Sequence, residues 1–296
     1  MFFRKILYSL LFLVIITSLY VYISSKQVSV PEAVPEAVPE TIVEEIISSK
    51  YSVIGKSVED RDIVLYKFGN GENNISFIGG IHGGYEWNSV FLAYKFIDYF
   101  TANPDAIPEN ITVSIIPVSN PDGLFKVTGK SGRFNLSDVS LSESILADGR
   151  FNANGVDLNR NFACDWKPQS TWKNNIVSAG SEVFSEPEAK AIKNFVELEK
   201  PKTVVFWHSQ ASTVYSSKCN DITLPETLEL MNKYSLASGY NAVASFDAYE
   251  ITGAAEDWLS TIGIPSITVE LTTHEAIDWE KNLAGVKAVF GHFGGV

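Results

Sequence analysis

The stretch IGGIHGGYEW, residues 78–87, places a histidine and a carboxylate where an apolar run ends. Ile75–Ile78 has the composition of a buried strand, and apolar residues recur at helical spacing after Asn88, a favourable helix cap. The pattern therefore predicts that His82 and Glu86 lie on a strand-to-helix turn.

This histidine and glutamate have the chemistry of metal ligands. Imidazole and carboxylate groups suit zinc, and a spacing of three or four residues at a helix start aims both side chains the same way. The alternative is a solvated histidine beside a glutamate that the helix dipole favours. The pair alone does not distinguish a metal site from a solvated surface pair. The other motifs of the chain are needed to distinguish them.

Composition limits the classes of protein that fit the chain. It has 296 residues, a hydrophobic content of 45%, 12 tyrosines and 18 phenylalanines, enough for a large core. One folded domain of about 250 residues is expected. The formal charge of −12 argues against nucleic acid as a partner.

The amino-terminal region predicts a membrane anchor. Arg4 and Lys5 precede an uncharged run over residues 6–24, which is long enough for a hydrocarbon core of about 30 Å. A cleaved signal peptide is the alternative, but the run exceeds a usual apolar signal region and lacks a small-residue cleavage site. The basic flank predicts cytoplasmic residues 1–5 and an extracytoplasmic body.

A stalk and a catalytic domain follow the anchor. Residues 25–50 contain the repeat VPEAVPEAVPE, whose prolines favour an extended, semi-rigid spacer. The folded body spans residues 51–296.

The body alternates strand and helix signals. Strands are predicted as a pair within residues 51–69, as a half-buried strand over 111–116, and as buried strands over 203–207 and 266–271. Helices are predicted from a capping box at 185–188, and over 226–237 and 279–290; SNPDG (119–123) reads as a turn and 124–156 as a long polar loop. This order implies an α/β fold with its site at the carboxyl ends of strands.

Residues with chemical reach recur at these strand ends and in the loops beyond them: HGGYE, NPDG, VDLNRNF, the HS after TVVFW, and the glutamate of TVEL. In this order the motifs resemble the zinc metallocarboxypeptidase family, of the carboxypeptidase A-like, small bacterial type. The resemblance covers most of residues 51–296. It implies a mixed, mainly eight-stranded sheet with helices on both faces.

The resemblance also implies a zinc site. His82, Glu86 and His208 would ligate one zinc per chain and leave the fourth position open, as catalytic zinc sites do. Glu270 would be the general base that moves a proton from water to the leaving amine. The alternative for Glu270 is a strand-end carboxylate that pairs with a lysine.

By the same resemblance, Asn159 and Arg160 would hold the terminal carboxylate of the substrate, since a guanidinium offers a planar two-donor fork. Arg150 is the candidate that stabilises the oxyanion, with Arg133 as the alternative. Asp157 either orients a ligand histidine or caps a turn.

The segment DAYEITGAAEDW, residues 247–258, resembles the specificity loop of the family. It would place Tyr249 over the substrate and Glu256 at the base of the side-chain pocket. An acidic pocket base favours a terminal lysine, arginine or diaminopimelate. A core-facing or solvated Glu256 is the alternative.

One departure from the family is that HGGYE has three residues between histidine and glutamate, where two are usual. The two glycines would permit a bulged turn. His274 and His292 read as surface or packing residues. Cys164 and Cys219 either pair, which would stabilise the fold by roughly 4 kcal/mol, or remain buried thiols.

The sequence therefore predicts a membrane-anchored, extracytoplasmic zinc carboxypeptidase that acts on peptides, with peptidoglycan stem peptides as one substrate. A deacylase of acyl-amino acids is the alternative within the enzyme class. A tethered peptide-binding module with a defunct metal site is the alternative outside it, and the HGGYE spacing is its only support.

Overall fold

The computed structural model describes residues 51–295. Its main sheet has eight strands in the order β1-β2-β4-β3-β7-β10-β8-β9. The strands are β1 (Tyr51–Lys56), β2 (Asp62–Gly69), β3 (Asn73–Ile78), β4 (Ile111–Ile116), β7 (Thr203–Ser209), β8 (Thr213–Ser216), β9 (Asn241–Val243) and β10 (Ser266–Leu271). The central run β4-β3-β7-β10 is parallel, whereas β1, β2 and β8 pair with their inner neighbours antiparallel. The mixed eight-stranded sheet that the sequence predicts is confirmed.

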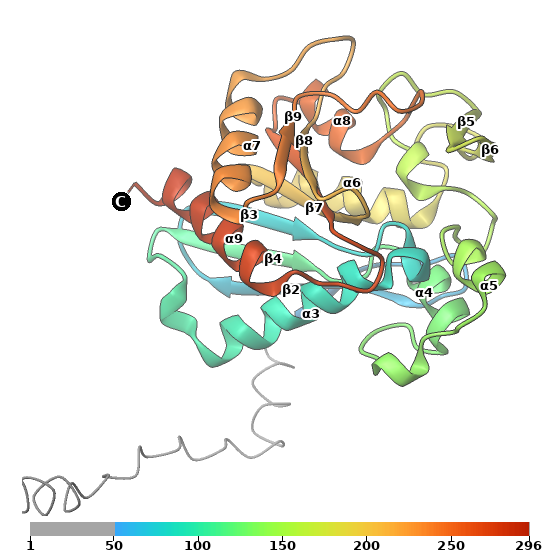
Figure 1. The fold of residues 1–296 in the computed structure, drawn as a ribbon, viewed down its shortest axis with the longest axis horizontal. Coiled ribbons are helices and arrows are strands. Elements are labelled where there is room, and N and C mark those ends of the chain that lie inside the picture. The colour runs from blue at the N-terminus through green and yellow to red at the C-terminus, as the bar shows by residue number, and fades with distance from the viewer. Residues whose placement is uncertain (1–50, 296) are drawn as a thin grey trace, which may run out of the picture. The chain divides into compact units, whose positions relative to one another are not determined.

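Helices cover both faces of this sheet, as predicted. The longer ones are α3 (Trp87–Ala102), α4 (Pro121–Thr128), α6 (Pro187–Glu199), α7 (Pro225–Ser238) and α9 (Trp279–Gly294), with shorter α5 (Glu143–Asp148) and α8 (Ala255–Thr261). One buried cluster joins the sheet to α3, α7 and α9, and a second joins it to α6 and α8. Helix α9 crosses in front of the sheet and α6 lies behind it (Figure 1).

Strand β7 shows why the central strands read as continuous apolar runs. Val205 and Trp207 belong to the cluster with α3, α7 and α9, whereas Val204 and Phe206 belong to the cluster with α6 and α8. A parallel strand between two helix layers needs apolar residues on both sides. For the same reason β4, predicted to be half-buried, is buried along its whole length.

Three local predictions are wrong. Asn88 does not cap α3, which begins one residue earlier; its side chain instead bonds Ser209 and the carbonyls of Thr273 and Ala276. Glu186, the cap residue of α6, makes no capping bond, so there is no capping box. The predicted turn SNPDG starts a helix, because the Asn120 side chain accepts from the amide of Gly123 and so caps α4.

The parallel strands bring the predicted chemistry to one edge of the sheet. β3 leads into the His82 turn, β7 includes His208 near its end, and β10 ends just after Glu270. Because these strands are parallel neighbours, their carboxyl ends meet. His208 and Glu270 are direct partners in the register of β7 and β10.

The predicted membrane anchor and stalk lie outside the described residues. Among residues 51–295, no helix combines the length and the apolar character that crossing a bilayer requires.

Candidate metal centre and substrate cavity

The turn after β3 brings His82 and Glu86 together despite their unusual spacing. A short 3-10 helix, η1 (Gly83–Glu86), connects the strand end to α3. Nδ1 of His82 lies 2.8 Å from Oε1 of Glu86, and both side chains are buried. The longer spacing is therefore compatible with a shared ligand site.

The two glycines are what permit this turn. Gly83 has a φ of +47°, and a Cβ there would lie 2.5 Å from the carbonyl oxygen of Gly149. A Cβ on Gly84 would lie 2.4 Å from the side chain of Val127. Since real Cβ atoms do not approach so closely, any side chain at either position would displace the turn from α4.

His208 completes a group of three potential ligands. Its Nδ1 lies 3.1 Å from Oε2 of Glu86 and 3.2 Å from Nδ1 of His82. The three residues offer ligand atoms that all lie within 4.8 Å of one another. A tetrahedral zinc site with bonds of about 2.0–2.1 Å separates its ligand atoms by roughly 3.3 Å. The spacing and the chemistry of these side chains therefore fit zinc.

The charges of these three residues are linked to one another. Burial opposes ionisation of Glu86, but the neighbouring His82 and His208 hold the pKa of its carboxyl well below the ordinary value. Burial likewise disfavours charge on His208, yet the Glu86 carboxylate raises the pKa of that imidazole to about 9. Glu86 is thus a buried anion whose charge is paired with the imidazole of His208.

Asp157 and Arg150 lie behind the ligands. Oδ1 of Asp157 is 3.5 Å from Nε2 of His82, and its Oδ2 accepts a 2.8 Å bond from Nε of Arg150. Nη1 of Arg150 is 3.9 Å from Oε1 of Glu86. Burial would raise the pKa of Asp157, but Arg150 and Arg160 hold it well below its usual value. Asp157 also accepts from the amide of Asn159 and so caps the turn at Leu158–Arg160, which is one of the two alternatives of the sequence analysis; its role toward His82 stays a prediction.

The structure distinguishes between the two arginines considered for the oxyanion. Arg150 is buried and lines the cavity that contains the ligands. Arg133 instead pairs with Asp98 at 2.7 Å and stacks over the ring of Tyr94, with its side chain 42% exposed. Arg150 is thus the arginine that the fold brings to the site.

Asn159 and Arg160 are held rigidly by backbone contacts. The guanidinium of Arg160 donates to the carbonyls of Asn159 and Thr171 at 2.7 and 3.0 Å. Oδ1 of Asn159 accepts a 2.9 Å bond from the amide of Ala255, and its Nδ2 donates to Glu256. These bonds fix the direction in which the pair faces the cavity.

Glu270 is a half-buried residue with one buried, unsatisfied oxygen. Its Oε2 has no hydrogen-bond partner among the described residues. Burial, reinforced by the nearby Glu86 carboxylate, raises the pKa of Glu270 to about 8. Such perturbed groups in clefts are frequent at catalytic sites.

One cavity of about 1140 Å³ brings all nine predicted site residues together. Its lining includes His82, Glu86, Arg150, Asn159, Arg160, His208, Tyr249, Glu256 and Glu270. Their roles in catalysis and binding stay predictions, but their convergence from five separate segments of the chain is a property of the fold.

His274 is a packing residue, as the sequence analysis allows, and it packs beside the candidate site. It lines the cavity, where its Nδ1 lies 2.8 Å from Oγ of Ser209 and its ring contacts Tyr85. The only signal in the sequence was its position four residues after Glu270. His292 of α9, by contrast, lies between Glu226 and Glu229 of α7, away from the site.

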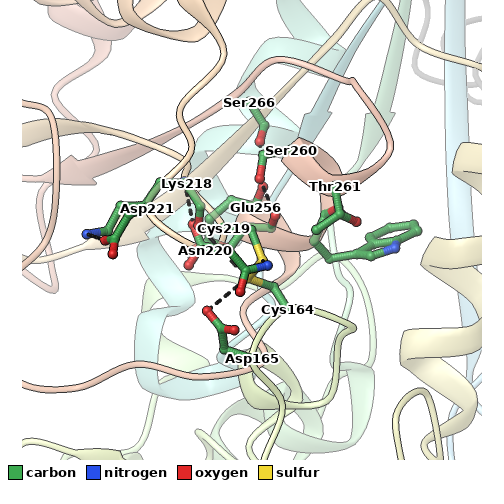
Figure 2. Close-up of a disulfide and its surroundings, with 12 residues drawn as sticks. Cys164, Asp165, Lys218, Cys219, Asn220, Asp221, Glu256, Ser260, Thr261 and Ser266 are labelled. Atoms are coloured by element: carbon green, nitrogen blue, oxygen red, sulfur yellow. Dashed lines mark hydrogen bonds and ion pairs between the residues drawn. A yellow bond between two sulfur atoms is a disulfide. The ribbon is translucent and has the colours of Figure 1, made fainter.

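A disulfide joins two walls of the cavity. Cys164 and Cys219 are bonded, which excludes the alternative of two free thiols. Figure 2 shows the bridge between the loop after the NRNF motif and the loop that carries Lys218, with Glu256 close by. The amide of Lys218 also donates to Asp257 at 2.9 Å, so this loop is tied to the start of α8.

Comparisons with known proteins agree with this geometry. A family model described as zinc carboxypeptidase matches residues 44–279. Gamma-D-glutamyl-L-diamino acid endopeptidase 1 of Lysinibacillus sphaericus is 25% identical over 241 residues, which cover 74% of this chain and 59% of that protein. Carboxypeptidase B of Helicoverpa zea is 26% identical over 250 residues, covering 76% and 57%. The chain thus spans less than two thirds of the length of these relatives.

Solved structures show the same fold. Bovine thrombin-activatable fibrinolysis inhibitor, in complex with tick carboxypeptidase inhibitor, superposes with a TM-score of 0.66 at 22% identity, over 85% of this chain and 94% of that one. Murein-tripeptide amidase MpaA from Escherichia coli O157 superposes with a TM-score of 0.58 at 21% identity, over 81% and 92%.

Proposed function

This chain belongs to the zinc carboxypeptidase family, and from that premise we propose that its folded body is a zinc-dependent peptidase that releases the carboxyl-terminal residue of a peptide. One observation carries the proposal. The three potential ligands, Glu270 and the Asn159–Arg160 pair all line a single cavity.

Different residues of the cavity would have different roles in the reaction. A zinc ion held by His82, Glu86 and His208 would polarise the scissile carbonyl and lower the pKa of a water molecule toward neutrality. Glu270 would accept a proton from the attacking water and pass it to the leaving amine. Arg150 would stabilise the negative charge that develops on the carbonyl oxygen.

The terminal carboxylate of the substrate would bind Asn159 and Arg160, and Tyr249 would close over it. A guanidinium forms two parallel charge-assisted bonds with a carboxylate, which fixes both position and angle. A free terminal carboxylate would then be a requirement, which is what distinguishes an exopeptidase from an endopeptidase.

For the substrate, we propose a peptide that ends in a diamino acid, such as a peptidoglycan stem peptide. Two related proteins carry names that point this way: a γ-D-glutamyl-L-diamino acid endopeptidase and a murein-tripeptide amidase. Within this chain, Oε2 of Glu256 is buried and has no hydrogen-bond partner among the described residues. A substrate ammonium group would supply that partner.

The Glu256→Gln variant tests this pocket. We expect the ratio of kcat/KM for lysine-terminal over phenylalanine-terminal peptides to fall about tenfold, because the amide removes the charge and keeps the shape. Glu250→Gln is the matched control, since Glu250 also lines the cavity but is exposed and paired with Lys167. An unchanged ratio in Glu256→Gln would exclude Glu256 from the pocket base.

We also propose that the domain acts outside the cytoplasm, anchored through residues 6–24. The uncharged run supports the anchor. The disulfide supports the location, because such bonds persist mainly in oxidising compartments.

The proposed activity is tested by zinc content and by release of free amino acid from peptides ending in lysine, phenylalanine or diaminopimelate, with the full chain purified in detergent. We expect about one zinc per chain and release of the terminal residue. Hydrolysis of acyl-amino acids alone would identify the deacylase. Folded protein with neither zinc nor turnover would identify the binding module, although the 2.8 Å contact of His82 with Glu86 weakens the argument for it.

A further inference from the structure

Tyr85, the residue directly before Glu86, has a side chain that the zinc site does not use. Its ring packs against Trp172 and His274, with centroids 5.1 and 4.6 Å apart. Its hydroxyl accepts a 3.0 Å hydrogen bond from Nζ of Lys173. All four residues line the cavity.

Lys173 lies at the turn between β5 (Gln169–Trp172) and β6 (Asn175–Ser178), a small separate sheet beside the cavity. Its φ is +54°, and Nζ of its exposed side chain lies 5.4 Å from the centre of the Trp172 ring. Among the described residues, Nζ of Lys173 donates a hydrogen bond to the Tyr85 hydroxyl, which is uncharged. An ammonium group has three donors, so this exposed cation has donors left for an anionic ligand.

The position of Lys173 relates it to a particular part of a substrate. Glu256, Asn159 and Arg160, which we assign to the carboxyl-terminal residue, are linked through Asn159. Tyr85 and Trp172 lie beside Arg150, whose Cζ lies 5.9 and 4.7 Å from their ring centres, and the backbone of the same hairpin accepts from Arg160 through Thr171. A peptide with its scissile carbonyl near Arg150 would extend its acyl portion toward Tyr85 and Lys173.

We propose that Lys173, oriented by Tyr85, binds a free carboxylate on the residue at the acyl side of the scissile bond. A γ-linked glutamyl residue presents such a group, because its α-carboxylate takes no part in the linkage. This inference rests on the proposed function and adds a second specificity element to it. Lys173 would contact the substrate, whereas Tyr85 would act by positioning Lys173.

Two substrates that differ in one group test the subsite. They are a γ-D-glutamyl-diamino acid peptide with a free α-carboxylate and its α-carboxamide analogue. We expect the full chain to prefer the carboxylate form by about tenfold in kcat/KM, the size of one partly exposed charge-assisted contact. In Lys173→Met this preference should disappear through loss on the carboxylate substrate, and Lys173→Arg should retain it.

Tyr85→Phe should lower the preference two- to threefold, since only the hydroxyl is removed. Lys287→Met, which removes an exposed lysine of α9, is the matched control and should behave like the native chain. Equal loss on both substrates in Lys173→Met, or no preference in the native chain, would overturn the proposal.

A binding measurement tests the proposed Lys173 subsite independently of the proposed peptidase activity. The affinities of both peptides for Glu270→Gln, measured by titration calorimetry, report on the carboxylate without turnover. If the full chain hydrolyses neither peptide, the proposed peptidase fails. A tenfold difference in affinity that Lys173→Met abolishes would still establish the subsite, and equal affinities would exclude it.

Discussion

Glu270→Gln is expected to hydrolyse peptides about 10²- to 10⁴-fold more slowly than the native chain, with zinc content unchanged. Glutamine has the shape of glutamate but cannot accept the proton from water. Because one oxygen of Glu270 makes no hydrogen bond with the described residues, the substitution should leave the melting temperature nearly unaltered. The measurements are kcat, metal analysis and thermal unfolding on the same preparation.

The control for this variant is Glu280→Gln, an exposed glutamate in the first turn of α9. It should retain native kcat. If Glu270→Gln kept more than a tenth of native kcat, another group would have to be the base. If it lost its zinc, the lower rate would reflect the metal site instead of proton transfer.

Arg160→Lys should lower kcat/KM for peptides with a free terminal carboxylate by about 10- to 10²-fold. Lysine keeps the charge but not the fork, so two charge-assisted bonds to the substrate become one, and bonds to charged groups contribute about 1.5–3 kcal/mol each. The bonds to Thr171 and Asn159 that orient the group would be lost as well. The measurement is kcat/KM on a peptide and on the same peptide with a terminal amide.

The peptide with a terminal amide distinguishes a loss of carboxylate recognition from structural damage to the protein. The native chain should discriminate strongly between carboxylate and amide, and Arg160→Lys should not. Arg133→Lys is the matched control, because Arg133 is a surface arginine paired with Asp98. A variant that loses activity equally on both peptides, with a lower melting temperature, would indicate a structural role for Arg160.

Much of the fold could be predicted because its central strands carry unmistakable patterns. TVVFW is almost entirely apolar and SITVEL has an apolar residue at every second position, and helices cover both faces of the sheet; His208 follows the first segment and Glu270 lies near the end of the second. The order of the motifs then placed all nine candidate residues in one cavity. Local sequence patterns were sufficient to predict that these residues meet, because the carboxyl ends of neighbouring parallel strands lie together.

The sequence does not predict the position of residues that are held by contacts between distant parts of the chain. Asn88 has the side chain of a helix cap, but it bonds carbonyls 185 and 188 residues away that no local pattern reveals. His274 and Lys173 approach Tyr85 from distant loops in the same way. In the polar stretch after the NPDG motif, short helices hold Arg150 in place although their sequences are weakly periodic.

The bridge between Cys164 and Cys219 has a practical consequence for how the protein is prepared. The bridge links two loops of the cavity wall near Glu256, whereas His82, His208 and Glu270 lie at the carboxyl ends of the parallel strands. Protein made in a reducing cytosol should therefore keep its metal ligands while the pocket loops lose their covalent link. Selectivity measured on such material would describe a different molecule from the oxidised one, so the thiol state belongs with every kinetic comparison.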